Sequence, residues 1–203
     1  MSQHSQDFYQ FQFDASLSRV LQLVEVDGRK TKIEKITGNT FDIDTNASGA
    51  VTQVVRTEVS RQGTTEVSIY SDANGDQRFD KTFEIEVAGA SARQLEQHRF
   101  TFDNAGNVTA EMERKGNGAW KTERIDANEH FSQIQLDGVN YLVKTEQERD
   151  GIEFTLLRDD NGDGIWTQIA EGETTGLHID NATGTIDLVG IQAYLASADT
   201  IVG

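Results

Sequence analysis

The chain has 203 residues with no cysteine and no proline, and its formal net charge is −16 at pH 7. Without cysteine there is neither a disulfide framework nor a thiolate metal site. The acidic balance argues against nucleic-acid binding, because phosphate contacts need lysine and arginine, and against binding to anionic membrane surfaces. No apolar run is long enough to insert into a membrane as a helix.

The N-terminal residues 1–18 are predicted to be an extension. The first seven residues, Met1 to Asp7, contain no basic segment followed by an apolar one, so the sequence predicts no cleaved secretory signal.

The next and longest part, residues 19–184, is predicted to be a single all-β repeat domain. Asn-Gly and Asp-Gly pairs recur from Asp27-Gly28 to Asn161-Gly162, and such pairs are strong signals for hairpin turns. Between them apolar and polar residues alternate, as in Phe83, Ile85 and Val87, which is typical of half-buried antiparallel strands. The absence of proline fits paired strands. We therefore expect an antiparallel up-and-down meander of hairpin repeats, forming a barrel, a sandwich or a curled sheet.

An internal repeat is predicted from three similar loops. Residues 57–76 resemble 145–163, and a third copy is predicted around Lys115-Gly116-Asn117-Gly118, with loop spacings of 41 residues (74 to 115) and 46 residues (115 to 161). An aromatic residue follows each loop: Phe79, Trp120 and Trp166. Repeats of this length suggest stacked units with one continuous core, which these aromatic residues would fill.

Two of the loops carry oxygen side chains at alternate positions. The candidate ligands, including backbone carbonyls at the seventh position, are Asp72, Asn74, Asp76, Arg78 and Asp80 in the first loop, and Asp159, Asn161, Asp163, Ile165 and Thr167 in the second. Calcium prefers six to eight oxygen ligands, and alternate residues of a tight loop can turn their oxygens inward. These loops resemble the calcium loop of EF-hand proteins, which implies Ca²⁺ as the bound ion.

The loops depart from that resemblance in two ways. Their flanks read as strands rather than helices, and position 12 is Phe83 or Ala170 instead of a bidentate glutamate. Glu84 or Glu171, one residue later, could replace it. The departures predict weak affinity, roughly 10⁻⁴–10⁻³ M. The alternative is an ordinary polar hairpin turn, and the lysine at 115 predicts that the middle loop binds no cation.

No constellation for catalysis is visible. The four histidines lack metal-ligand spacing, and His98 and His130 are predicted to be surface or half-buried residues on strands. The chain has no nucleophile elbow, phosphate-binding loop or HExxH motif. We therefore expect a protein that is not an enzyme.

The C-terminal residues 185–203 are predicted to be a tail, with a short helix through Leu188, Ile191 and Leu195 or a strand at 185–188. Segments 184–191 and 198–203 resemble the termini of bacterial RTX-type proteins, although the glycine-rich nonapeptides of that family are absent. The resemblance implies calcium dependence and export by type I secretion through an uncleaved C-terminal signal.

These observations predict a non-enzymatic calcium-binding module, secreted or on the cell surface without a signal peptide. In this hypothesis calcium stabilises an acidic folded state. Two alternatives stay open: a metal-free structural or interaction protein of phage or cytosolic origin, and a carbohydrate-binding or carbohydrate-active protein. The sequence identifies no protein or glycan partner.

Overall fold

A computed structural model describes residues 7–61, 63–88, 96–136, 139–148, 151–175, 179–180 and 185–186. Among these residues there is no helix, and antiparallel strands joined by hairpins make up the fold. The predicted all-β class is confirmed. None of the described residues belongs to a helix with the length and apolarity that a membrane crossing requires.

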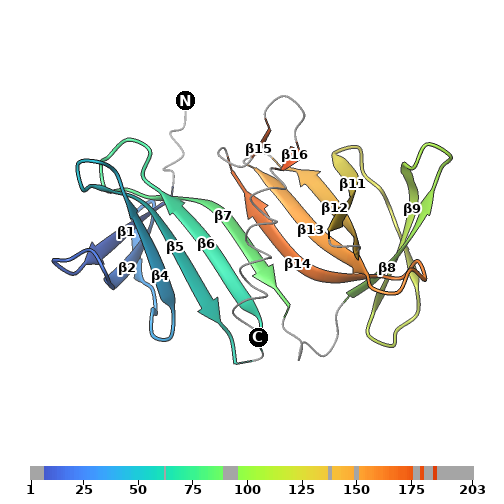
Figure 1. The fold of residues 1–203 in the computed structure, drawn as a ribbon, viewed down its shortest axis with the longest axis horizontal. Helices are drawn as coiled ribbons and strands as arrows, with labels where there is room; N and C mark the ends of the chain where they lie inside the picture. The colour runs from blue at the N-terminus through green and yellow to red at the C-terminus, as the bar shows by residue number, and fades with distance from the viewer. Residues whose placement is uncertain are drawn as a thin grey trace. The chain divides into compact units, whose positions relative to one another are not determined.

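The chain forms two compact units, Met1–Ser91 and Ala92–Gly203. Figure 1 shows the strands of the first unit in blue to green. They are β1 (Phe8–Phe13), β2 (Val20–Asp27), β3 (Lys30–Ile33), β4 (Thr40–Thr45), β5 (Val51–Val59), β6 (Thr65–Ser71) and β7 (Asp80–Val87). Strands β1 to β3 form one sheet, and β4 to β7 form a meander in chain order.

The second unit repeats this order of seven strands. They are β8 (Glu96–Phe102), β9 (Val108–Lys115), β10 (Lys121–Glu123), β11 (Glu129–Leu136), β12 (Val139–Gln147), β13 (Ile152–Asp159) and β14 (Trp166–Thr174). Two short strands follow, β15 (Ile179–Asp180) and β16 (Thr185–Ile186), and they pair with each other. Within each unit the described strands follow one open order, which ends at β3 and β4 in the first unit and at β10 and β11 in the second, so neither unit is a closed barrel.

The pairing between the first and last strands is also repeated. In the first unit Tyr9 pairs with Phe79, and in the second His98 pairs with Trp166. The β1–β2 and β8–β9 hairpins both have a register shift one residue before the strand end, at Gln12/Phe13 and Thr101/Phe102. Shared irregularities of this kind make the two units copies of one pattern, since a bulge is a specific local feature rather than a general property of strands.

Each unit has its own hydrophobic core, and the two cores correspond at six positions. The strand registers match Val54 with Leu142, Tyr70 with Leu157, Phe79 with Trp166, Phe11 with Phe100, Phe13 with Phe102, and Phe41 with Phe131. Full burial of one such side chain contributes roughly 1.5–3 kcal/mol, so these six positions are where the repeated pattern is stabilised.

Alternation along the strands explains why these segments pair as they do. On β7 the side chains of Phe83 and Ile85 are buried, while Glu86 on the other face is exposed. A period of two places one apolar face against the core and one polar face toward solvent.

The predicted three-copy repeat is wrong, and the correct period is about twice as long. The loop at Lys115 joins β9 to β10, so its counterpart is the Asp27-Gly28 turn between β2 and β3. Gly28 and Gly116 have the same left-handed conformation, with φ of 56° and 55°. The true partners are the Asp72 and Asp159 loops, which follow β6 and β13 and lie 87 residues apart.

The predicted domain bounds at residues 18 and 184 stay a prediction. Within the predicted N-terminal extension, Phe8–Phe13 is a paired strand that contributes Phe11 and Phe13 to the first core. Of the predicted tail, only Thr185–Ile186 is described, and the short helix and the export signal lie outside the described residues.

Candidate functional site

The first candidate loop is organised around the buried carboxylate of Asp72, which is 5% exposed. Its Oδ1 accepts a hydrogen bond from the backbone N–H of Gly75 at 2.7 Å, and its Oδ2 accepts one from the N–H of Gln77 at 2.9 Å. Further along, Asp76 Oδ1 accepts the N–H of Arg78 at 2.9 Å. Short polar side chains that bond to nearby backbone groups fix turns of this kind.

The second loop repeats the same hydrogen bonds around Asp159. Its Oδ1 accepts the N–H of Gly162 at 2.8 Å, and its Oδ2 accepts the N–H of Gly164 at 3.1 Å. Asp163 Oδ1 accepts the N–H of Ile165 at 2.8 Å. Two loops 87 residues apart therefore share one side-chain-to-backbone frame.

The side chain of the asparagine at the third position bonds to the second aspartate of each loop. Asn74 Oδ1 accepts the N–H of Asp76 at 3.0 Å, and its Nδ2 lies 3.3 Å from Asp76 Oδ2. Asn161 makes the same two contacts with Asp163, each at 3.1 Å. The structure thus brings positions 1, 3 and 5 together in both loops.

Positions 7 and 9 are placed by the strands that follow the loops. The guanidinium of Arg78 lies 4.8 Å from the centre of the Phe8 ring, and its backbone carbonyl is the candidate ligand. Asp80 is the first residue of β7. In the second loop Ile165 precedes β14, and Thr167 lies on β14, opposite Arg158 of β13.

The glutamates suggested as substitutes for position 12 have other partners. Glu84 Oε2 lies 2.8 Å from Lys81 Nζ and accepts a hydrogen bond from Ser68 at 3.3 Å. Glu171 accepts a hydrogen bond from Gln168 at 2.7 Å. These partners lie on strands outside the loops, and the role of the two glutamates as substitutes for position 12 stays a prediction. Among the described residues no group of three or more His, Cys, Asp or Glu lies close enough to hold a metal ion.

Electrostatic repulsion is present in the first loop. Burial raises the pKa of Asp80 above its usual value, and the nearby charges of Asp76 and Asp72 raise it further. Like charges disfavour ionisation of their neighbours, and a bound cation would reverse that effect.

The residues of the middle loop have a different role. Lys115 Nζ lies 3.2 Å from Glu96 and 3.8 Å from Glu113, in ion pairs that belong to the β8–β9 hairpin. The Trp120 ring lies close to two guanidinium groups, 4.5 Å from that of Arg99 and 4.6 Å from that of Arg114. By contrast, Phe79 and Trp166 are buried in their cores as expected.

A buried charge cluster in the second unit was missed by the sequence analysis. His98 Nδ1 lies 2.8 Å from Glu111 Oε1, and Lys144 Nζ lies 3.1 Å from Glu111 Oε2 and 2.8 Å from Glu129. His98 is 6% exposed, so its prediction as a surface or half-buried residue is wrong. The signal that could have found the cluster is the β8–β9 hairpin register, which puts His98 and Glu111 two positions apart on facing strands.

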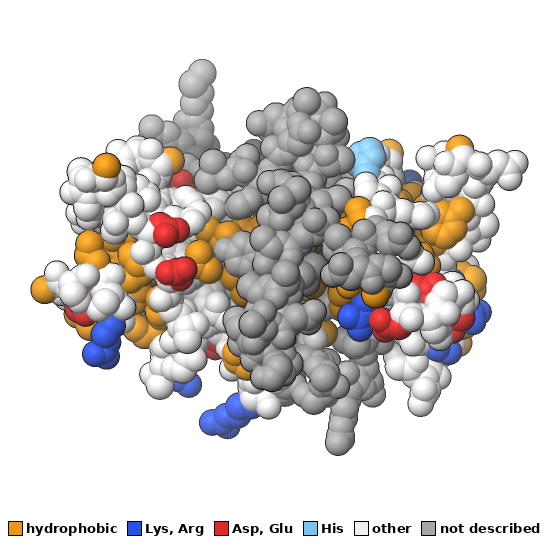
Figure 2. Space-filling view, in the orientation of Figure 1, with side chains coloured by type: hydrophobic (Ala, Val, Ile, Leu, Met, Phe, Trp, Pro, Cys, Tyr) orange, Lys and Arg blue, Asp and Glu red, His pale blue; other side chains and the backbone are white. Residues whose placement is uncertain are grey.

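The surface drawn in Figure 2 carries acidic and basic side chains interspersed among the described residues.

Comparisons with protein-family models, with curated proteins and with solved structures found no match to this chain.

Proposed function

We propose that this chain is a non-enzymatic calcium-binding module with one ion at each of the two repeated loops. One observation carries the proposal: Asp72, Asn74 and Asp76 lie in the same hydrogen-bonded frame as Asp159, Asn161 and Asp163. Calcium is the cation that prefers such a set of carboxylate, amide and carbonyl oxygens.

The backbone hydrogen bonds support binding by fixing the ligands in advance. Each oxygen of an ionised carboxylate has two acceptor sites, so Asp72 Oδ2, which accepts only the N–H of Gln77, keeps a lone pair for a metal. Ligands that are already ordered lose less conformational entropy when the ion binds. In the first loop Asp80 and the Arg78 carbonyl would add to the set, and in the second the Ile165 carbonyl and Thr167.

The charge balance supports a role in stabilising the fold. A net charge of −16 opposes compaction by self-repulsion. Calcium that binds only the folded loops would stabilise them by about 2.7 kcal/mol per site at 100 times Kd. Because position 12 lacks its glutamate, we expect weak sites that fill at the millimolar calcium of extracellular fluids. An extracellular or cell-surface location is therefore part of the proposal.

The test is a pair of melting curves, one in millimolar calcium chloride and one in excess chelator, with magnesium chloride as the control for ionic strength. We expect a higher Tm in calcium than in either of the other conditions, and two ions per chain by titration calorimetry. Equal melting temperatures in calcium and chelator would contradict the proposal and favour a metal-free structural protein.

A further inference from the structure

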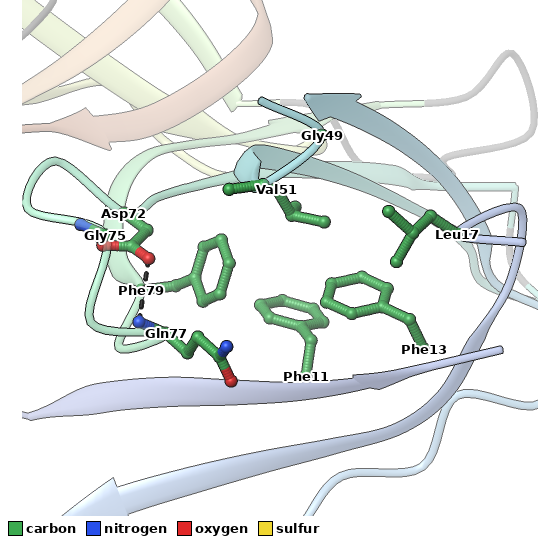
Figure 3. A pocket seen from close by; sticks show the side chains of 10 residues that line it. Phe11, Phe13, Leu17, Gly49, Val51, Asp72, Gly75, Gln77 and Phe79 are labelled. Atoms are coloured by element: carbon green, nitrogen blue, oxygen red, sulfur yellow. Dashed lines mark hydrogen bonds between the residues drawn. The ribbon is translucent and has the colours of Figure 1, made fainter. Parts of the chain in front are cut away.

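The first unit contains a cavity of about 210 Å³ beside the Asp72 loop. Figure 3 shows its wall, in which the rings of Phe11, Phe13 and Phe79 lie between Leu17 and Gln77. Val51 completes the apolar lining, and Asp72 lies at the edge. All of these residues belong to the first unit.

Two residues of this cavity have unusual backbone conformations. Leu17 has φ of 55° and Gln77 has φ of 65°, and among the described residues no other non-glycine residue has a positive φ. The left-handed region is unfavourable for a residue with a Cβ, above all for a bulky one such as leucine. Conformations of this kind persist where the surrounding structure enforces them, and they gather at functional sites.

The second unit has glycine at both equivalent positions. The N–H of Leu17 donates to the carbonyl of Asp14 at 3.1 Å, and the N–H of Gly106 donates to the carbonyl of Asp103 at the same distance. Gln77 and Gly164 each donate an N–H to the aspartate that begins their loop. Gly106 and Gly164 have φ of 86° and 77°, so both positions are left-handed in each unit while the side chains differ.

The first unit therefore carries side chains where the shared backbone favours glycine, and both of them line one cavity. Leu17 adds an apolar wall, and the Gln77 side chain adds an amide, with one donor group and one acceptor, at the rim. The Asp72 carboxylate accepts backbone hydrogen bonds of its own loop, where it is a proposed calcium ligand, so the polar group offered to a cavity ligand is the neutral Gln77 amide.

We propose that this cavity binds a small neutral compound with one aromatic ring and a hydroxyl group, the ring against the exposed sides of the packed phenylalanines and the hydroxyl at the Gln77 amide. Its volume suits a single ring, because an apolar cavity of about 150 Å³ holds benzene. Phenylalanine rings pair favourably with another aromatic ring edge to face. The cavity shares Asp72 and Gly75 with the first loop, but the groups proposed to contact the ligand, the phenylalanine rings and the Gln77 amide, include no proposed calcium ligand.

The experiment uses the full chain and 4-fluorobenzyl alcohol as the probe, observed by ¹⁹F NMR in calcium and in chelator. We expect saturable line broadening with a Kd in the millimolar range, roughly the strength available to a ligand of nine heavy atoms. Probe binding both in calcium and in chelator would show that the cavity does not need the ion. Failure of the calcium proposal would appear in a different measurement, as a Tm that does not change with calcium.

Two variants restore the residues of the second unit. Leu17→Gly and Gln77→Gly relieve the backbone strain, so each should keep a Tm near that of the parent, and each should weaken probe binding at least tenfold. Gln77→Ala removes the amide without restoring glycine and should weaken binding too. Leu21→Ala, at a residue 51% exposed on β2 and outside the cavity, is the matched control and should bind as the parent does. The proposal fails if the parent shows no saturable binding, or if Leu17→Gly and Gln77→Gly bind the probe as well as the control.

Discussion

His98 Nδ1 lies 2.8 Å from Glu111 Oε1 at the two positions where the first unit has Tyr9 and Leu23. Leu23 is fully buried and Glu111 is 1% exposed, so a carboxylate occupies the place of a core leucine. Lys144, on β12, supplies the second partner of this carboxylate. The same position thus holds a buried leucine in one unit and a carboxylate of a charge cluster in the other.

The substitution Glu111→Gln is expected to destabilise the protein by about 1–3 kcal/mol, because it leaves His98 and Lys144 with a weaker buried partner. The measurement is the free energy of unfolding at pH 7 from urea denaturation followed by circular dichroism. Glu86→Gln, at an exposed residue of β7, is the control and should change stability by less than about 0.5 kcal/mol. Equal stability of the two variants would show that the cluster contributes nothing net.

The stability contributed by Glu111 should depend on pH in one direction. Burial acts to raise the pKa of this carboxyl, but the hydrogen bond from His98 and the charge of Lys144 lower it below its ordinary value of 4.5. A lowered folded-state pKa means that the contribution is present above that value and is lost as the pH falls through the folded-state pKa. The difference in unfolding free energy between the parent and Glu111→Gln should therefore shrink below about pH 4.5. A difference that stays constant from pH 7 to pH 3 would contradict this assignment.

Substitution to alanine at the left-handed position of each loop should affect stability differently in the two units. Gly164→Ala places a Cβ at φ of 77° and should cost about 1–2 kcal/mol. Gln77→Ala leaves a Cβ where one already exists, so it should be nearly neutral. The measurement is the Tm of each variant relative to the parent, with chelator present. Equal losses would mean that the two backbone positions are not equivalent.

Substitution of the loop aspartates should reduce the Tm increase in calcium, whereas substitution in the turn between β9 and β10 should not. Asp163→Ala and Asp76→Ala each remove a proposed ligand and should lose part of the Tm increase that the parent shows in millimolar calcium. In chelator each loses only exposed hydrogen bonds, from the N–H of Ile165 or Arg78 and from the side-chain amide of Asn161 or Asn74, with a small effect. Asn117→Ala, in the turn between β9 and β10, should keep the full calcium response. Loss of that response in Asn117→Ala would contradict the site assignment.

The second core should be sensitive to loss of volume. Leu142 is fully buried against Leu157 and Trp166, so Leu142→Ala should cost about 2–5 kcal/mol. Leu21→Ala, at an exposed leucine, should cost less than about 0.5 kcal/mol. Urea denaturation of the two variants makes the comparison. A small cost at Leu142 would mean that this cluster does not hold the unit together.

Local patterns predicted the strands and turns well, because alternation and left-handed glycines are properties of neighbouring residues. Phe83 and Ile85 are buried as their spacing predicts, and Asp72 and Asp159 occupy equivalent turns. The repeat period was wrong because Lys115-Gly116 resembles the loops locally, while its true equivalence with Asp27-Gly28 depends on which strands pair. Pairing is a non-local property that similarity between short segments does not report.

The buried cluster and the cavity were beyond sequence reasoning for the same physical reason. Nothing near His98 in the sequence indicates a carboxylate 13 residues away, because only the hairpin register brings Glu111 beside it. Leu17 and Gln77 are 60 residues apart and meet at one cavity only through the fold.

The residue that follows each loop gives the two sites different optical properties. Trp166 comes three residues after Asp163 and is buried in its core, whereas Phe79 holds the equivalent place after Asp76. Indole emission responds to changes in its surroundings, and phenylalanine does not emit in that range. Ion binding at the second loop should therefore change the tryptophan fluorescence of the chain, while the first loop fills without a signal at those wavelengths.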